Sequence, residues 1–212
     1  MNMKFYMTPG SCSTGIHILL EEVGEIFEVT IVNLMAGDHQ KPDYLAINPK
    51  ATIPTLLTKE GLALTDFMSI AWWIGKNYPR RHLLPSELND ELKVLEAMSY
   101  AVNTIHGQGF TRIFTTEKYS NNEAEFEAIK QQGEEIVKRG FDLMNDSLEG
   151  KDYIVETFSI ADAALFYVEF WAEHLGMSLP EHCSAHYQRM LTRPAVRQVL
   201  TEEGYGALFQ RI

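Results

Sequence analysis

One cysteine stands where a helix is expected to begin. Cys12 follows a strand-like segment and the turn Thr8-Pro9-Gly10, and apolar residues with helical spacing start shortly after it. Backbone amides and the positive end of the helix dipole stabilise an anion at such a position, so we expect a lowered pKa for the Cys12 thiol. A buried, inert cysteine in a turn fits the same position equally well. Because residues 13–15 include no second cysteine, covalent chemistry at Cys12 would need an external thiol.

Two further positions offer groups that bind a peptide-like ligand. Ile53-Pro54 lies between a helix stop at Asn48-Pro49 and a strand-like segment, so Pro54 is a candidate for a cis peptide bond, although trans proline is commoner. The backbone of Ile53 would then pair with an extended peptide. Asp66 precedes a helix, where its carboxylate either caps the helix or, with the helix-start amides, binds the zwitterionic end of an amino acid.

A row of polar residues borders the apolar stripe of the 87–106 segment. Ser99, Asn103 and His106 have the i, i+4, i+7 spacing that places side chains on one helix face. Such a row indicates either a wet cleft or a solvent-exposed polar stripe, and spacing alone does not separate the two. A protonated His106 near Cys12 would favour a thiolate further.

Two other patterns carry less chemistry. His182, Cys183 and His186 include histidines at i, i+4, as in some metal sites, but no fourth ligand lies nearby in the sequence. We interpret them as part of a surface helix and expect no metal. Gly107-Gln108-Gly109 does not follow a strand and is no nucleotide-binding loop; we expect it to weaken or kink its helix.

Alternating strand-like and helix-like segments position the groups in the first part of the chain. The expected strands are 4–7, 27–32, 55–58 and 62–64, and the expected helices are 16–23, 42–47 and 66–78. The order βαβαββα within about 80 residues is that of a thioredoxin-like domain.

Beyond residue 86 the strand signal nearly disappears. Apolar residues keep helical spacing in the 87–106 segment and in later ones, and Ser159 with Asp162 forms a capping box that starts another helix. The sequence therefore predicts an α/β domain at 1–79, a proline-containing linker at 80–86 and an all-helical bundle domain at 87–212.

The composition is that of a folded protein with an acidic surface. The 212-residue chain is 45% hydrophobic, and 18 basic against 29 acidic residues give a net charge of −11. Such a surface repels phosphate backbones and anionic lipid, so we expect neither nucleic acid nor a membrane as a partner. No apolar run is long enough to span a bilayer, and the N-terminus has no signal-peptide pattern. With two cysteines only, we expect a reducing, cytoplasmic location.

The motifs together resemble the glutathione S-transferase family, most closely its bacterial beta class. The resemblance covers nearly the whole chain, and the motifs occur in the family's order. The matching segments are Pro9-Gly10-Ser11-Cys12-Ser13 with His17, Asn48-Pro49-Lys50, Ile53-Pro54, Leu64-Thr65-Asp66 with Ile70, His106 before Phe110, Phe158-Ser159-Ile160-Ala161-Asp162-Ala163 and Arg193-Pro194-Ala195-Val196.

The resemblance implies a homodimer that binds glutathione along the thioredoxin-like domain. The implied glutathione site comprises Cys12, Ile53, Pro54, Asp66 and Phe67, with Ser99 and Asn103 reaching across the dimer or into the cleft. His106 is implied as the polar partner of the glutathione sulfur. Phe110, Phe114 and Trp171 are implied to line a pocket for a small hydrophobic or electrophilic acceptor.

Some positions depart from the family's pattern. Phe67 stands where a serine or glycine is usual, Thr52 replaces a glutamine or lysine, and one residue is inserted after His106. Lys41 and His39 are both candidates for the basic residue that holds the glycine carboxylate of glutathione.

We expect an enzyme that activates the glutathione thiol and transfers it to an electrophilic acceptor, giving a thioether. Two alternatives remain open from the sequence. One is thiol–disulfide exchange through Cys12 with glutathione. The other is a non-catalytic binding or interaction protein with the same fold, which Phe67 and Thr52 favour.

Overall fold

A computed structural model describes residues 2–209 and divides the chain into two compact units. The first unit takes in the chain up to Leu84 together with the segment from Met190 on, and the second is Pro85–Arg189. The return of the C-terminal segment to the first unit differs from the expected division, in which all of 87–212 formed one domain. It is explained by α9 (Pro194–Glu202), whose Val196, Val199 and Leu200 are fully buried and which packs against α1 (Ser13–Val23).

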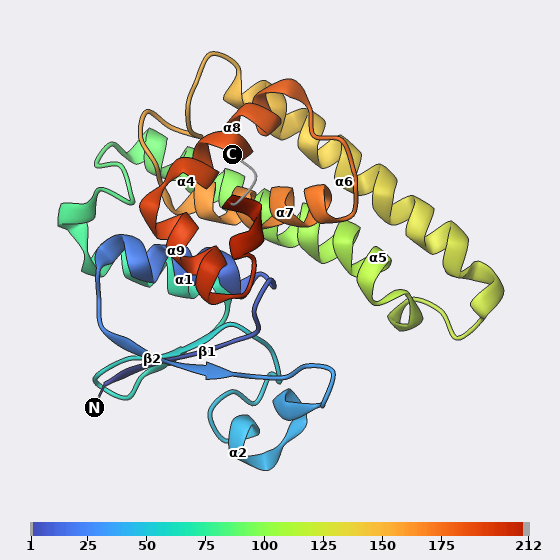
Figure 1. Cartoon of the computed structure of the whole chain (residues 1–212), viewed down its shortest axis with the longest axis horizontal. Helices are drawn as coiled ribbons and strands as arrows, with labels where there is room; N and C mark the ends of the chain where they lie inside the picture. The colour runs from blue at the N-terminus through green and yellow to red at the C-terminus, as the bar shows by residue number, and fades with distance from the viewer. Residues whose placement is uncertain (1, 210–212) are drawn as a thin grey trace. The chain divides into compact units, whose positions relative to one another are not determined.

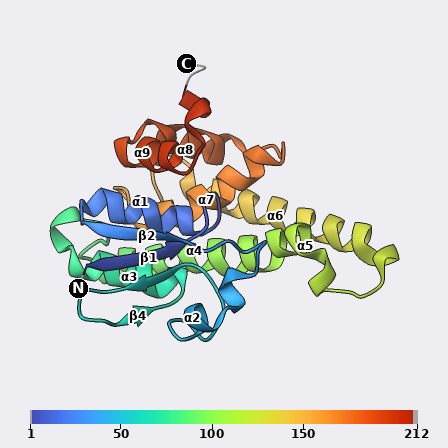
Figure 2. The ribbon, with the colours of Figure 1, turned by 60° about the horizontal axis from the view of Figure 1, so that its bottom comes forward.

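The first unit is built on a mixed four-stranded sheet with the order β2-β1-β3-β4 (Figure 2). β1 runs parallel to β2 with Met3 opposite Phe27, and antiparallel to β3 with Phe5 opposite Leu56. Met3, Phe5 and Met7 alternate into the core, the period-2 pattern of a strand with one buried face. The strands are β1 (Met3–Met7), β2 (Phe27–Ile31), β3 (Thr55–Leu57) and β4 (Ala63–Leu64).

Helices complete the predicted order βαβαββα, which the structure confirms. α1 and α3 pack against each other, and α1 ends at Gly24, whose φ of 69° is a conformation that glycine adopts without strain. The helices of this unit are α1, α2 (Pro42–Leu45), α3 (Phe67–Asn77) and α9, with 3₁₀ turns η1 (Asp38–Gln40), η2 (Pro79–Arg81) and η6 (Gly206–Phe209).

The second unit is helical, as expected, and has no strand within its described residues. Its long helix α6 runs beside α5 in both views (Figures 1 and 2). Its elements are α4 (Leu88–Ser99), η3 (Tyr100–Phe110), α5 (Thr111–Phe114), η4 (Thr116–Lys118), η5 (Glu123–Glu125), α6 (Phe126–Leu148), α7 (Ile160–His174) and α8 (Glu181–Thr192), the last of which continues past Arg189.

The segment η3 is a π-helix, which joins α4 to α5 without a break. The π-helix continues through Gly107-Gln108-Gly109, and its wider turn accommodates an extra residue relative to an α-helix. Gly109 has a second role here, because a Cβ at this position would lie 2.6 Å from Val137 Cγ2 on α6. The glycine lets η3 and α6 approach closely.

α7 is the central helix of the second unit, and its predicted start is confirmed. Ser159 accepts a hydrogen bond from the Ala161 amide, and Asp162 accepts one from the Ser159 amide at 2.7 Å. Every residue from Ile160 to Ala172 is buried. The capping box therefore fixes the start of the element that carries Tyr167 and Trp171.

Candidate functional site

The turn that carries Cys12 is fixed by side chains on both sides of it. Ser11 Oγ donates to Thr8 O at 2.6 Å and accepts from the Ser13 amide at 3.1 Å. Gly10 N and Thr14 Oγ1 both donate to Glu203 Oε2, each at 2.7 Å. Cys12 is therefore presented by a turn that the carboxylate of Glu203 ties to the C-terminal segment.

The expected lowering of the Cys12 pKa is wrong. Burial, together with the negative charge of Asp66, raises the pKa of Cys12 to about 12, although the amides of Cys12 and Ser13 act in the opposite direction. Cys12 is only 9% exposed, and its Sγ lies 3.7 Å from the carbonyl oxygen of Ile53 as a donor. The helix dipole is present, but desolvation of the thiolate outweighs it. Cys12 is a neutral thiol at neutral pH.

The Ile53-Pro54 bond is cis, as predicted. The loop before this bond is held by the side chains of Tyr44 and Asn48. In the sequence analysis these residues only marked a short helix and its end. Asn48 Nδ2 donates to Thr52 O at 2.8 Å, and Tyr44 Oη donates to the same oxygen at 2.5 Å. The Ile53 carbonyl, the acceptor of the Cys12 thiol, thus belongs to a fixed loop.

Asp66 and Phe67 differ sharply in exposure. Asp66 is exposed and makes no capping hydrogen bond to α3, so the capping interpretation is wrong for its side chain. Phe67 is 2% exposed, and its ring belongs to the core. Through its charge Asp66 acts on Cys12, so the structure brings together three of the predicted glutathione-site residues: Cys12, Ile53 and Asp66.

The two basic candidates lie in the same stretch of the first unit. Lys41 Nζ pairs with Asp38 Oδ1 at 2.6 Å and lines a cavity of about 270 Å³ with Tyr6 and Tyr44 among its walls. His39 is half-buried, and its Nδ1 has no hydrogen-bond partner within residues 2–209. Lys41 thus already has a carboxylate partner, whereas the His39 ring has an unused nitrogen.

In the second unit, the three residues expected to line an acceptor pocket form one aromatic cluster, in which Trp171 also contacts His106. The centroid of the Trp171 ring lies 4.9 Å from that of His106 and 5.3 Å from each of Phe110 and Phe114, with the rings edge-to-face. Phe110 and Phe114 stack on each other at 5.6 Å. Tyr167 completes this aromatic cluster at 5.0 Å from Trp171. The sequence analysis missed Tyr167, although its i, i+4 spacing to Trp171 could have indicated it.

His106 is uncharged at neutral pH. Burial lowers the pKa of His106 to about 4, so the protonated form considered from the sequence is absent there. Its Nδ1 lies 3.1 Å from the Tyr167 hydroxyl. A neutral ring with one nitrogen engaged by Tyr167 still offers an N–H donor or a lone pair on the other nitrogen.

Ser99 and Asn103 lie on one face, as predicted, because Asn103 Nδ2 donates to Ser99 Oγ at 3.1 Å. Asn103 is exposed and Ser99 is half-buried. His106 contacts Tyr167 and Trp171 on α7.

The expectation of a surface helix for His182, Cys183 and His186 is wrong for two of the three. Cys183 and His186 are fully buried. Cys183 Sγ donates to Phe141 O at 3.6 Å, and burial raises the pKa of its thiol. His186 Nδ1 lies 2.8 Å from Glu169 Oε2, and its Nε2 lies 3.3 Å from Asp162 Oδ1. These are interactions within the core of the second unit.

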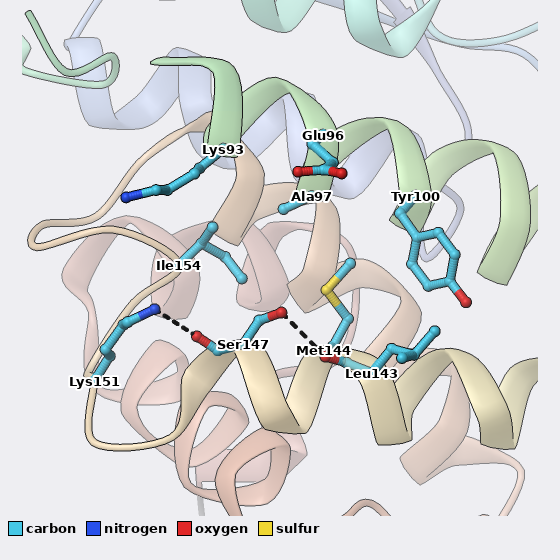
Figure 3. Close-up of a pocket in the computed structure, with 9 residues that line it drawn as sticks. All are labelled: Lys93, Glu96, Ala97, Tyr100, Leu143, Met144, Ser147, Lys151 and Ile154. Carbon is cyan, nitrogen blue, oxygen red and sulfur yellow. Dashed lines mark hydrogen bonds between the residues drawn. The ribbon is translucent and has the colours of Figure 1, made fainter. Parts of the chain in front are cut away.

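A cavity of about 380 Å³ lies between α4 and α6 in the second unit (Figure 3). Lys93 and Glu96 come from α4 and Tyr100 from the start of η3, and Met144 and Ser147 face them from α6. None of the predicted site residues lines it. Among residues 2–209, no helix is both long and apolar enough to span a lipid bilayer.

The known proteins that are similar to this chain include named glutathione S-transferases. Residues 10–77 match the family model of the glutathione S-transferase N-terminal domain. The chain is 34% identical over 210 residues to glutathione S-transferase GstA of Escherichia coli O157:H7, covering 95% of this chain and 99% of that protein.

Solved structures agree with this sequence match. A sphingomonad glutathione S-transferase complexed with glutathione is 28% identical with a TM-score of 0.82, over 95% of this chain and 98% of that one. A bacterial beta class glutathione S-transferase of Sphingomonas chungbukensis is 26% identical, also with a TM-score of 0.82, over 95% and 99% of the two chains.

Proposed function

Since the chain belongs to the glutathione S-transferase family and acts as a glutathione transferase with glutathione as its co-substrate, we propose roles for its residues in that reaction. The glutathione thiol is the nucleophile, and it attacks a small hydrophobic electrophile. The carbon–sulfur bond forms as the leaving group departs or the acceptor bond opens, and the thiol proton passes to solvent.

The aromatic cluster of the second unit is the observation that carries this proposal. His106, Phe110, Phe114 and Trp171 form a largely apolar surface, whose polar groups are the nitrogens of His106 and the indole N–H of Trp171. Phe114 is 48% exposed, so part of this surface is accessible. An apolar wall with few polar groups suits a small aromatic electrophile. We propose His106 as the hydrogen-bond donor to the glutathione sulfur through Nε2–H, with Tyr167 donating to Nδ1.

In the first unit we propose that Ile53, Pro54, Asp66 and the helix start at Phe67 bind the peptide part of glutathione. Ser99 and Asn103 of the second unit are proposed as further polar contacts. Cys12 acts as a neutral S–H donor near the sulfur. Its raised pKa does not favour thiol–disulfide exchange, because the thiolate that exchange requires is scarce at neutral pH.

We further propose that the protein is a homodimer of the beta class and works in the cytoplasm. The similarity to a beta class enzyme supports the class. The two cysteines, which form no disulfide with each other, fit a reducing compartment. Light scattering of the purified chain at micromolar concentration tests the dimer, and a mass near 24.2 kDa would reject it.

Steady-state conjugation of glutathione to a chromogenic aryl halide tests the proposed acceptor surface. In Phe114→Ala we expect the KM for the aryl halide to rise about threefold to tenfold, since one aromatic contact is worth about 0.5–1.5 kcal/mol. The KM for glutathione and retention on immobilised glutathione should not change. Leu175→Ala is the matched control, because Leu175 is 46% exposed in the same unit and lies outside the cluster.

Cys12→Ser separates conjugation from exchange. We expect the variant to keep conjugation, because glutathione supplies the attacking sulfur, and to lose any mixed disulfide at position 12. An unchanged KM for the aryl halide in Phe114→Ala, or loss of conjugation in a folded Cys12→Ser, would contradict the proposed roles.

A further inference from the structure

A cluster of potential metal ligands lies in the first unit, where α1 meets α9 (Figure 1). His17 and Glu21 are one helical turn apart on α1, and Glu202 ends α9. One ligand atom from each of these three residues lies within 4.8 Å of the others. No proposed glutathione contact or aromatic-cluster residue belongs to this group.

The imidazole of His17 is oriented as in histidine–metal sites. It is 3% exposed, and its Nδ1 lies 2.9 Å from Glu203 Oε1. Because a carboxylate only accepts hydrogen bonds, Nδ1 carries a proton, and Nε2 is the ring nitrogen that a metal ion would use. Metal-binding histidines typically donate their second N–H to a carboxylate in this way.

The other ring nitrogen is buried and lacks a hydrogen-bond partner. Among residues 2–209, Nε2 of His17 makes no hydrogen bond, and Glu202 Oε2 lies 3.5 Å from it. A buried polar atom without a partner needs an explanation, and an unseen ion is one of the usual ones. Nε2 lies beside the carboxylates of Glu21 and Glu202, so the cluster combines two acidic side chains with a buried imidazole nitrogen.

The charges around Nε2 favour a cation. Glu21 and Glu202 each place a carboxylate oxygen within 4.8 Å of the His17 ligand atom, so two acidic side chains converge beside this nitrogen. One imidazole nitrogen with two carboxylate oxygens is a donor set that suits a borderline divalent ion better than Ca²⁺ or Mg²⁺, which prefer oxygen ligands alone.

We propose that His17 Nε2, Glu21 and Glu202 bind one Zn²⁺, with water completing the coordination. Glu203 orients the imidazole, and the same carboxylate holds Gly10 and Thr14 of the Cys12 turn. The ion would join α9 to α1 and would act on the stability of the C-terminal segment and not on the conjugation reaction.

The test is Zn²⁺ binding to untagged, chelator-treated full-length protein by calorimetry. We expect one site per chain, and at least tenfold weaker binding in the double variant Glu21→Gln with Glu202→Gln. The control is Glu134→Gln with Glu135→Gln, which removes the same charge from exposed positions on α6 and should bind Zn²⁺ as the wild type does. Circular dichroism checks that both variants fold.

Two further measurements separate a metal from other occupants. Zn²⁺ at saturation should raise the unfolding midpoint of the wild type and the control but not of the Glu21/Glu202 variant. In nitrogen NMR spectra of the histidines, Zn²⁺ should shift the Nε2 resonance of His17, because the ion coordinates the lone pair of that nitrogen. Absence of one-site binding, binding that survives the double variant, protons on both His17 nitrogens at saturating Zn²⁺, or a preference for Ca²⁺ would each overturn the proposal.

Discussion

Each unit contains a buried histidine between two carboxylates, and the two sites differ in how fully the carboxylate at the histidine Nδ1 is hydrogen-bonded, whereas Nε2 of both histidines lacks a hydrogen-bond partner among the described residues. In the first unit, Glu203 accepts hydrogen bonds from Gly10, Thr14 and His17. In the second unit, His186 lies between Glu169 and Asp162, and all three side chains are 0% exposed. Glu169 Oε1 and His186 Nε2 have no hydrogen-bond partner among the described residues.

Incomplete hydrogen bonding in the second unit is accompanied by shifted pKa values of Glu169 and His186. Burial raises the pKa of Glu169, and His186 only partly opposes this effect. Burial also works against a charged His186, but Glu169 and Asp162 outweigh it and raise the pKa of His186. A carboxylate with a full set of donors fixes chain geometry, whereas a buried, partly satisfied pair depends on its charge balance.

The largest effect should come from His186. In His186→Leu, two carboxylates remain buried without their cation, so we expect the free energy of unfolding to fall by about 3–5 kcal/mol. Urea denaturation measures it. In the double variant His186→Leu with Glu169→Leu, much of the loss should return, because an apolar pair replaces a broken ionic one. A double variant no more stable than the single one would mean that packing, and not charge, dominates this site.

Glu203→Gln should lower the free energy of unfolding by less than His186→Leu does. The amide removes one acceptor oxygen from the three donors at that site, and we expect a loss of about 1–3 kcal/mol. Glu202→Gln in metal-free protein is the matched control, because that side chain is 51% exposed and an exposed ion pair contributes about 0–1 kcal/mol. Equal losses in the two variants would remove the distinction between a satisfied and an exposed carboxylate.

The next largest effect should be the pH dependence that His186 and Glu169 give to the free energy of unfolding. The folded pKa of His186 is raised, so its contribution is fully present below the unfolded value of about 6.5 and is lost as pH rises through the folded pKa. Glu169 acts in the same direction from lower pH, because its folded pKa is also raised. The free energy of unfolding, measured by urea denaturation at pH 6, 7.5 and 9, should decline by at most about 1.4 kcal/mol per pH unit and per proton. The decline should flatten in the His186/Glu169 double variant.

The smallest effect concerns Cys12, which lies next to the turn held by Glu203. In Asp66→Asn, removing one negative charge should lower the pKa of Cys12 and speed its alkylation at pH 8 by about twofold, with desolvation still dominant. Iodoacetamide labelling followed by mass spectrometry measures the rate. Asp43→Asn, also exposed in the first unit, should leave it unchanged. A Cys12 that labels faster than a free thiol would restore the lowered pKa expected from the helix dipole.

Local patterns in the sequence predicted local features well. The cis bond at Pro54, the capping box of Ser159 with Asp162 and the order of the first seven elements were predicted correctly. Each depends on residues that are close in the chain or on a known element order. Phe110, Phe114 and Trp171 were placed by resemblance, and the structure brings them together.

Features that depend on burial or on distant partners were missed. The spacing of His182 and His186 does not show which face of the helix is inside, although Glu169 in an otherwise apolar run hinted at a buried cation. The helix start at Cys12 is visible in the sequence, but the desolvation of its thiol is not. The contact of Gly10 with Glu203 spans 193 residues, and no local pattern encodes it.

That last contact has a consequence for synthesis on the ribosome. Gly10 favours glycine, because its φ is 70° and a Cβ there would meet the hydroxyl of Tyr205. The N-terminal sheet and α1 emerge first, yet the partners of Gly10 and His17 are translated almost at the end. At about 5–20 residues per second, the unit made first waits on the order of ten seconds for its last segment. The second unit, whose residues are contiguous, has all its partners earlier and is expected to finish folding first.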